Sequence, residues 1–369
     1  MKKKVALIGT NGIPAKYGGF ETLTEYLTKH LNEEFELSVY CAKTPKKNRL
    51  KTYLNAKLIY LPFKANGWQS MVYDAISIIH ALFYSEVLVI LGFSGIFAFP
   101  FKIFFRKKKI VFNIGGVEWQ KVRGKKTFAA LEIRAKKWFE KVCVSYSDVI
   151  VTDNQVLWDY VKETYHIDSV LAEYGGDHAV KKLVTEPLVV KYPFLSKEYD
   201  VSISRAQEDM NIHMLIEAYK QIPDRDLVIV SNWETSEYGL KLKNENNEKY
   251  PNIYLQDAVY NLDELNAIRS NGQIYFHTHS LCGTAPSLTE AMSLGLPVIC
   301  FDVNTNRSST EEKSYYFKDA ESLVEILDGL DESAISLLAE NMNEIAIRRY
   351  NWKRIAGLYR KCINNIIIK

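Results

Sequence analysis

Short apolar runs alternate with helix-length segments along this chain, and the alternation occurs twice. Parallel strands joined by helices are buried on both faces, so each strand is expected to be a nearly continuous apolar run. The sequence therefore predicts an α/β protein built from two doubly wound sheets in tandem. The predicted strands are residues 4–8, 37–41, 57–61, 87–91, 110–113 and 149–152, and then 200–204, 227–230, 253–255, 273–276 and 298–301.

The length of the chain also favours two domains. A chain of 369 residues is longer than one hydrophobic core usually organises. We place the first Rossmann-like domain at residues 1–185, the second at residues 186–349, and a closing helix at residues 350–369.

The five cysteines are too few and too widely spaced for a disulfide framework or a C-x-x-C metal site. The apolar stretch that follows the first lysines is too short for the core of a signal peptide. These features predict a cytoplasmic protein, with a reducing compartment fitting best, and they offer no credible metal cluster.

Positive charge is concentrated in one region. Residues 102–141 contain 13 Lys or Arg and 3 Glu, a local excess of 13 − 3 = +10 in a chain whose net charge is +3. The apolar segment before it, residues 87–101, is shorter than the ~20 residues of a spanning helix and is interrupted by Gly92, Gly95 and Pro100. Two interpretations stay open: a solvated basic face beside an ordinary core, or docking on anionic lipid headgroups. Nucleic-acid binding is disfavoured because no recognised motif accompanies the charge.

A glycine-rich loop at residues 9–19 connects the first strand to the first helix. Unpaired N–H groups at such a helix start can hold an anion. The glycine spacing differs from G-x-G-x-x-G, and the Lys-Ser/Thr pair of a P-loop is missing. The loop is therefore either one lip of a ligand site or simply a tight turn.

A second motif is more specific. Residues 276–280 end a strand, and Pro286 lies where the first turn of the next helix is expected. Thr284, Ser287 and the N–H groups of that turn could hold a diphosphate, and Glu290 could accept hydrogen bonds from ribose hydroxyls. This segment follows the carboxyl end of a strand, where open α/β sheets bind ligands.

Two further positions follow predicted strands. Arg205 could make a forked contact to the same phosphates, or it could pair with Glu208 or Asp209 at the surface. In the first domain, residues 113–120 end a strand and include Glu118 and Trp119, which could position a sugar unless the tryptophan belongs to the core.

These motifs together resemble glycosyltransferase family 4, and more closely its subgroup of capsular and group-polysaccharide rhamnosyltransferases. The similarity covers nearly the whole chain. I-G-T-N-G-I-P-A-K-Y-G-G-F-E at residues 8–21 matches the opening of the subgroup, N-I-G-G-V-E-W at residues 113–119 matches its acceptor-side loop, and residues 283–302 provide a later match.

The resemblance implies a GT-B fold, in which two Rossmann-like domains face each other across a cleft and the C-terminal helix crosses back to the first. It also implies sugar transfer from a nucleotide sugar to a lipid-linked saccharide in bacterial cell-surface polysaccharide synthesis. The transfer is expected to retain the anomeric configuration and to need neither a metal nor a cofactor. The expected location is the cytoplasm, with peripheral contact at the inner face of the plasma membrane. The expected catalytic residues are Arg205 and Glu118; the expected donor-binding residues are Gly18, Gly19, Arg205, Asn211, Gly283, Thr284, Pro286, Ser287 and Glu290; the expected acceptor-binding residues are Lys16, Tyr17, Glu118 and Trp119.

Two positions depart from the family pattern. Cys282 occupies the position of a common glutamate, and Asn211 lies near the position of a phosphate-binding lysine. They keep open a non-catalytic sugar-nucleotide-binding partner of an assembly complex. A UDP-sugar epimerase is the alternative enzyme, because it shares the two-domain architecture.

Overall fold

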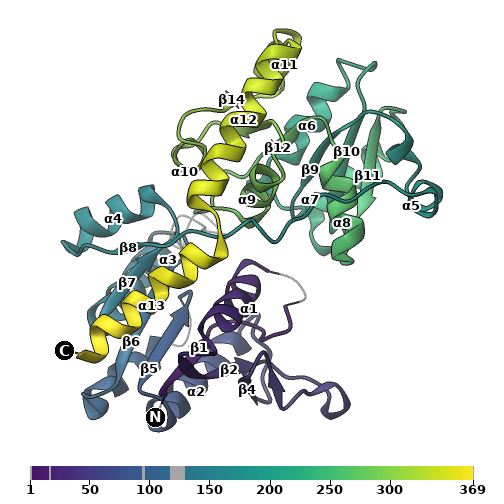
Figure 1. Cartoon of the computed structure of the whole chain (residues 1–369). Coiled ribbons are helices and arrows are strands. Elements are labelled where there is room, and N and C mark those ends of the chain that lie inside the picture. The colour runs from purple at the N-terminus through teal and green to yellow at the C-terminus, as the bar shows by residue number, and fades with distance from the viewer. Residues whose placement is uncertain (1, 16–17, 94–95, 117–128, 369) are drawn as a thin grey trace. The chain divides into compact units, whose positions relative to one another are not determined.

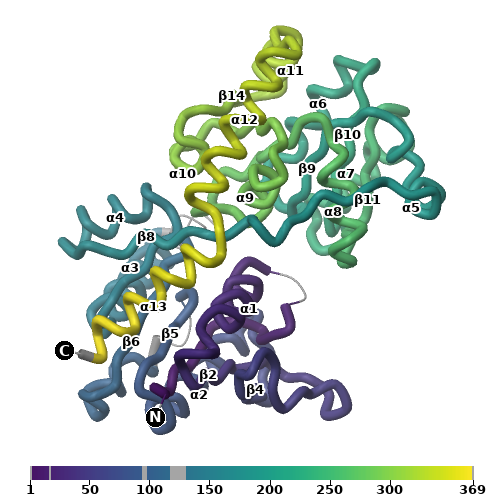
Figure 2. The backbone as a smooth tube through the Cα atoms, viewed as in Figure 1, coloured from purple at the N-terminus to yellow at the C-terminus, as the bar shows by residue number. Residues whose placement is uncertain are grey.

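The computed structural model describes residues 2–15, 18–93, 96–116 and 129–368. The chain forms two compact units, Met1–Tyr174 together with Trp352–Lys369, and Gly175–Asn351. It leaves the first unit after Tyr174, ahead of the predicted boundary at residue 185, and returns to it at Trp352 (Figure 2).

The first unit contains an eight-stranded sheet in the order β3-β4-β2-β1-β5-β6-β7-β8 (Figure 1). All neighbouring strands are parallel except β3 and β4. The strands are β1 (Lys3–Ile8), β2 (Phe35–Cys41), β3 (Thr52–Tyr53), β4 (Ala56–Tyr60), β5 (Val87–Leu91), β6 (Lys109–Ile114), β7 (Val149–Thr152) and β8 (Val170–Leu171).

Helices cover both faces of this sheet, as the apolar strands require. Val5 and Leu7 of β1 belong to the core that includes residues of α1 and α13, whereas Ala6 and Ile8 belong to the core that includes residues of α2 and α3. Alternate residues of a strand point to opposite faces, so one apolar strand serves both cores. The helices are α1 (Gly19–Leu31), α2 (Gln69–Tyr84), α3 (Ala129–Tyr146), α4 (Gln155–Tyr165) and α13 (Trp352–Ile368), with short 3₁₀ helices η1 (Lys46–Asn48) and η2 (Ile96–Phe105).

Helix α13 belongs to the first unit although it follows the second in sequence. Its buried residues include Trp352, Ile355, Tyr359 and Ile363. The Trp352 ring stacks on Tyr26 of α1 with a centroid distance of 4.7 Å. The helix thus supplies one side of the first unit's core.

The second unit contains a parallel sheet of six strands in the order β11-β10-β9-β12-β13-β14. Its strands are β9 (Asp200–Ile203), β10 (Leu227–Ser231), β11 (Ile253–Asp257), β12 (Tyr275–His277), β13 (Val298–Phe301) and β14 (Tyr315–Phe317). Its helices are α5 (Glu186–Lys191), α6 (Ile212–Tyr219), α7 (Glu237–Asn246), α8 (Leu262–Ser270), α9 (Pro286–Ser293), α10 (Asn304–Ser309), α11 (Ala320–Asp328) and α12 (Glu332–Arg349), with 3₁₀ turns η4 (Pro193–Ser196), η5 (Glu208–Met210) and η6 (Trp233–Thr235).

This strand order reverses its direction between β9 and β12. The chain builds the sheet outward through β10 and β11, then returns to the other side of β9 with β12 and continues through β13 to β14. In such sheets the loops after the two central strands separate to opposite faces and leave a crevice where ligands bind. The ends of β9 and β12 are therefore the place to look for a site.

The predicted fold class is confirmed by the two parallel sheets and their covering helices. Strands 87–91, 149–152 and 298–301 are confirmed residue for residue. The interrupted apolar segment after β5 contains the 3₁₀ helix η2 with Pro100 inside it. Proline lacks the N–H group that a continuous α-helix needs at that position. Among the described residues, no helix is both long and apolar enough to cross a membrane.

Replacing Trp352 with alanine should lower the free energy of unfolding by about 3–5 kcal/mol, because it leaves a cavity beside Tyr26 in the core. Urea denaturation followed by circular dichroism measures the change. Trp68→Ala is the matched control, since the Trp68 side chain is exposed and its loss should have little effect. Equal stability of the two variants would show that α13 does not stabilise the first unit.

Candidate functional site

Arg205 lies directly beyond the end of β9, at the reversal point of the second sheet. The loop around it is fixed, because the Ala206 N–H donates to Asn232 Oδ1 at 3.1 Å and the Ser236 hydroxyl donates to the Ala206 carbonyl. The Arg205 side chain is exposed. Among the described residues it forms no ion pair with Glu208 or Asp209, so the exposed guanidinium is accessible to an anion.

The loop that follows β12 is held in place by two segments of the second unit, one around η5 and one on α10. Asn211 donates its side-chain N–H to the Thr278 carbonyl at 3.0 Å, and Asn306 donates to the His279 carbonyl at 2.9 Å. The Ser280 N–H and hydroxyl both donate to the Asp209 carbonyl at 2.9 Å. The loop is therefore preorganised, and Asn211 is one of its anchors; the predicted contact of Asn211 with the donor stays a prediction.

Helix α9 begins where this loop ends. Pro286 occupies its first turn as expected, and no side chain caps the helix start. Gly283 and Thr284 are buried just before it, and Ser287 is half-buried. An uncapped helix start presents N–H groups and a positive dipole to an anion. The predicted diphosphate contacts at Gly283, Thr284, Pro286 and Ser287 stay predictions, with a suitable local structure.

Glu290 lies one turn into α9 and is part of a buried ion pair. Its Oε2 atom lies 2.5 Å from Nη2 of Arg269, and its Oε1 atom lies 3.1 Å from Nε2 of His178. Burial by itself would raise the pKa of Glu290, but Arg269 and His178 together hold that pKa below its ordinary value. The side chain is 15% exposed, so ribose hydroxyls would have to share a carboxylate that these two residues already orient.

Two histidines flank Thr278 at the end of β12. His277 is 1% exposed, and its ring centroid lies 4.2 Å from that of His279. Burial, followed by the nearby charge of Arg205, lowers the pKa of His279 to about 3. Burial, followed by the effect of His279, lowers the pKa of His277 well below its ordinary value. Both rings are therefore neutral at physiological pH.

The glycine loop of the first unit is occupied by carboxylates of its own chain. Glu21 Oε1 accepts hydrogen bonds from the Asn11 N–H at 2.9 Å and from the Asn11 side chain at 2.8 Å. Glu25 Oε2 accepts from the Ala15 N–H. These amides are not available to an anion, which favours the tight-turn interpretation for this part of the loop.

Gly18 and Gly19 lie at the start of α1. Gly18 has a φ of 114°, and a Cβ atom there would lie 2.1 Å from Oε2 of Glu21. Glycine is favoured because residues with a Cβ atom rarely adopt this positive φ, whereas the contact with the end of the flexible Glu21 side chain could be relieved. Lys16, Tyr17, Glu118 and Trp119 lie outside the described residues, so the predicted acceptor site stays a prediction.

Comparison with known proteins gives two adjoining matches. Residues 191–349 match the family described as glycosyl transferases group 1, and residues 2–177 match a domain of unknown function, DUF1972. Residues 191–349, which make up most of the second unit, are therefore similar to a glycosyl transferases group 1 domain.

Similarity extends over the whole length of several proteins. An uncharacterized glycosyltransferase of Methanocaldococcus jannaschii is 22% identical over 391 residues, which cover 95% of each chain. Sucrose-phosphate synthase from Thermosynechococcus elongatus has a TM-score of 0.80 at 16% identity, over 99% of this chain and all of that one. HepE of Anabaena in complex with UDP has a TM-score of 0.75 at 13% identity, over 98% of this chain and all of that one. These structures confirm the predicted two-domain GT-B fold.

Within the second unit, sequence reasoning missed Arg269 and His178. Arg269 lies on α8, and His178 lies in the segment that enters the second unit. Neither belongs to a recognisable motif, because their role depends on where folding brings them relative to Glu290. A sequence pattern could not have indicated this pairing.

Replacing Glu290 with glutamine should lower the free energy of unfolding by about 3–5 kcal/mol at pH 7, because Arg269, only 3% exposed, loses its counter-charge. Because the folded-state pKa of Glu290 is lowered, its contribution is present above the ordinary glutamate pKa and lost as the pH falls through the folded value. The difference between wild type and variant should therefore vanish in acid.

Urea denaturation at a series of pH values measures this difference. Glu264→Gln is the matched control, because Glu264 pairs with Lys191 at the surface and its replacement should change stability little. A Glu290→Gln effect that is equally large at neutral and acid pH would contradict the ion-pair account.

Proposed function

We propose that the protein transfers a hexose, with rhamnose as the candidate, from a nucleotide sugar to a lipid-linked saccharide in the synthesis of a bacterial cell-surface polysaccharide such as a capsule. The observation that supports this most directly is the exposed guanidinium of Arg205 at the end of β9, beside the loop that leads from β12 to the uncapped start of α9. The fold alone would not suffice, because one fold serves many functions. The match of residues 191–349 to glycosyl transferases supports the reaction class.

The chemistry requires stabilisation of a leaving diphosphate. Breaking the bond between the sugar and the phosphate leaves the electron pair on the phosphate oxygen and positive charge on the sugar. Arg205 and the N–H groups at the start of α9 would stabilise the diphosphate as its charge develops. Glu290, oriented by Arg269 and His178, would accept hydrogen bonds from the ribose. The acceptor oxygen then forms the new bond and loses its proton, to the departing phosphate in a retaining reaction.

Acceptor recognition is assigned to the first unit. Glu118 would position the acceptor hydroxyl or assist as a base, and Lys16, Tyr17 and Trp119 would contact the saccharide. Gly18 and Gly19 allow the chain to pass close to a bound donor because they carry no side chain. The assignment follows the resemblance of residues 8–21 and 113–119 to the rhamnosyltransferase subgroup.

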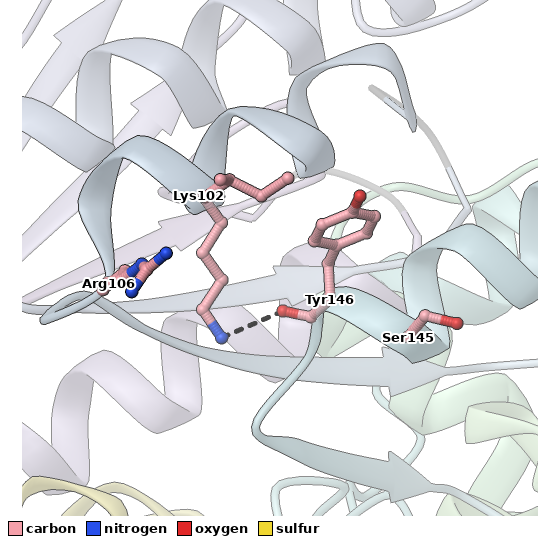
Figure 3. A pocket seen from close by; sticks show the side chains of 5 residues that line it. Lys102, Arg106, Ser145 and Tyr146 are labelled. Atoms are coloured by element: carbon pink, nitrogen blue, oxygen red, sulfur yellow. Dashed lines mark hydrogen bonds between the residues drawn. The ribbon is translucent and has the colours of Figure 1, made fainter.

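A surface of the first unit has the composition that a membrane-facing enzyme needs. Large apolar side chains on η2 are exposed, with Phe104 80% and Ile103 53% accessible. Basic residues lie among them, and Figure 3 shows Lys102 and Arg106 beside a hollow lined also by Ser145 and Tyr146. Apolar side chains flanked by cations suit the boundary between acyl chains and anionic headgroups.

The cations at this surface are not equivalent. Lys102 donates to the Tyr146 carbonyl at 3.0 Å (Figure 3) and forms an ion pair with Asp148. Among the described residues, neither Arg106 nor Lys107 forms an ion pair, and both side chains are exposed. Arg106 and Lys107 are therefore the cations that headgroup phosphates would meet first. This arrangement supports the proposal that the protein works at the inner face of the plasma membrane.

Arg205→Ala should reduce kcat for sugar transfer about 100-fold, since losing one contact to developing charge raises the barrier by about 3 kcal/mol. Transfer is measured with the donor selected from UDP-, GDP- and dTDP-sugars by its effect on thermal stability. Lys241→Ala, which removes an exposed cation from α7, is the matched control and should keep full activity.

One outcome would count against the role of Arg205, and two would count against the transferase. Undiminished transfer by Arg205→Ala would refute the role of that residue. Donor binding without hydrolysis or transfer would favour the non-catalytic binding partner. Conversion of the donor to its epimer, without any acceptor, would favour the epimerase.

Replacing both Ile103 and Phe104 with serine should reduce binding to anionic liposomes at least about tenfold. The reason is that docking on the membrane removes the apolar surface of both side chains from water. Complete burial of one such side chain typically contributes about 1.5–3 kcal/mol to the free energy of binding. Flotation with vesicles containing phosphatidylglycerol measures the bound fraction. Ile347→Ser, which changes an exposed apolar residue of the second unit, is the control. Absence of wild-type binding even at low salt would contradict the membrane proposal.

A further inference from the structure

His277, His279 and Cys282 form a cluster at the end of β12 that the proposed reaction does not use. Each contributes one nitrogen or sulfur atom that could bind a metal, and these atoms all lie within 4.8 Å of one another. The spacing His-x-His-x-x-Cys brings them together because β12 ends at His277 and the following loop turns back. Among the described residues, no other three His, Cys, Asp or Glu side chains place their ligand atoms this close together.

The imidazoles of this cluster have unsatisfied nitrogens. His277 is 1% exposed, and neither of its ring nitrogens makes a hydrogen bond to a described residue. The Nε2 atom of His279 is also buried without a hydrogen bond. Buried polar atoms are nearly always paired, because an unpaired one loses its hydration without compensation. Three unsatisfied nitrogens in adjacent rings indicate a missing ligand.

The backbone that carries the cluster is rigid enough to hold an ion. Asn211, Asp209 and Asn306 fix the main chain at residues 278–280, between the two histidines and the cysteine. These bonds use main-chain atoms and the Ser280 hydroxyl, so they do not occupy the imidazole nitrogens. Small side-chain rotations would bring the three ligand atoms to the separations of about 3.3–3.5 Å that Zn–N bonds of about 2.0 Å and a Zn–S bond of about 2.3 Å give in a tetrahedron.

We propose that His277, His279 and Cys282 bind a single Zn²⁺ ion. Two imidazoles and one thiolate are the nitrogen and sulfur ligands that zinc prefers, whereas Mg²⁺ and Ca²⁺ require oxygen ligands. On binding, the Cys282 thiol loses its proton to solvent and the sulfur bonds to the metal. Three protein ligands leave the fourth position to water or to an oxygen of a bound anion.

The charges around the three ligands are compatible with a bound Zn²⁺ ion. Arg205 lies close enough to influence His279, and its positive charge opposes the binding of a second cation. The thiolate offsets one of the two positive charges of zinc. The remaining charge, together with Arg205, favours an anion in the fourth position. Zinc binding itself does not depend on the proposed sugar transfer.

Zinc binding is tested on the full-length chain, stripped with chelator and kept reduced with a phosphine. Titration with ZnCl₂ against a chromophoric chelator should give one site per chain, and elemental analysis after gel filtration should give the same ratio. Co²⁺ used in place of zinc should produce visible bands of tetrahedral intensity and a thiolate-to-cobalt charge-transfer band.

Cys282→Ser should abolish the charge-transfer band and weaken zinc binding more than about 100-fold, since loss of an outer-shell partner alone costs about 10–100-fold. His279→Gln should weaken binding similarly. Each variant is compared with itself in chelator and with zinc, so that a loss of stability from the substitution alone is separated from a loss of metal binding. Only the wild type should gain thermal stability on adding zinc.

Cys362→Ala and His166→Asn are the matched controls, and both should keep the wild-type cobalt spectrum. Cys362 is a thiol of the first unit, and His166 is an exposed imidazole whose left-handed conformation suits asparagine. Failure of reduced wild type to bind zinc stoichiometrically would overturn the proposal. So would an unchanged cobalt spectrum in both Cys282→Ser and His279→Gln.

Discussion

The pairing of β12 beside β9 is the constraint on which the second unit's site depends. Because the chain returns to the middle of the sheet only after β11 is in place, the loops that follow β9 and β12 meet there although about 70 residues separate them in sequence. Arg205 follows the first of these strands, and the histidine loop follows the second. The strand order therefore brings Arg205 close to the histidine loop.

Hydrogen bonds to the main chain then fix what the sheet has brought together. The loop at residues 278–280 is anchored on two segments of the same unit, around η5 and at α10. The ion pair of Glu290 with Arg269 connects α9 to α8 and, through His178, to the segment that enters the unit. A binding surface held in this way loses little conformational freedom when a ligand arrives, because its ordering cost is met during folding.

The sequence predicts the fold better than the site. Strands such as 87–91 are apolar along their whole length, and this local pattern was enough to predict the strand with its observed bounds. Pro286 marks a helix start for an equally local reason. The partners of Glu290 and the role of Asn211 depend on contacts between distant segments, which no local pattern encodes. The Glu21 carboxylate in the glycine loop was missed for a different reason, since glycine spacing does not show which groups already satisfy the amides.

The return of α13 to the first unit has a consequence for the order of folding. The ribosome releases α13 only after the whole of the second unit has been synthesised. Until then the apolar face of α1 around Tyr26 lacks the partner that covers it. The first unit therefore cannot complete its core until the second unit has been synthesised. During translation its uncovered apolar surface is accessible to chaperones and proteases.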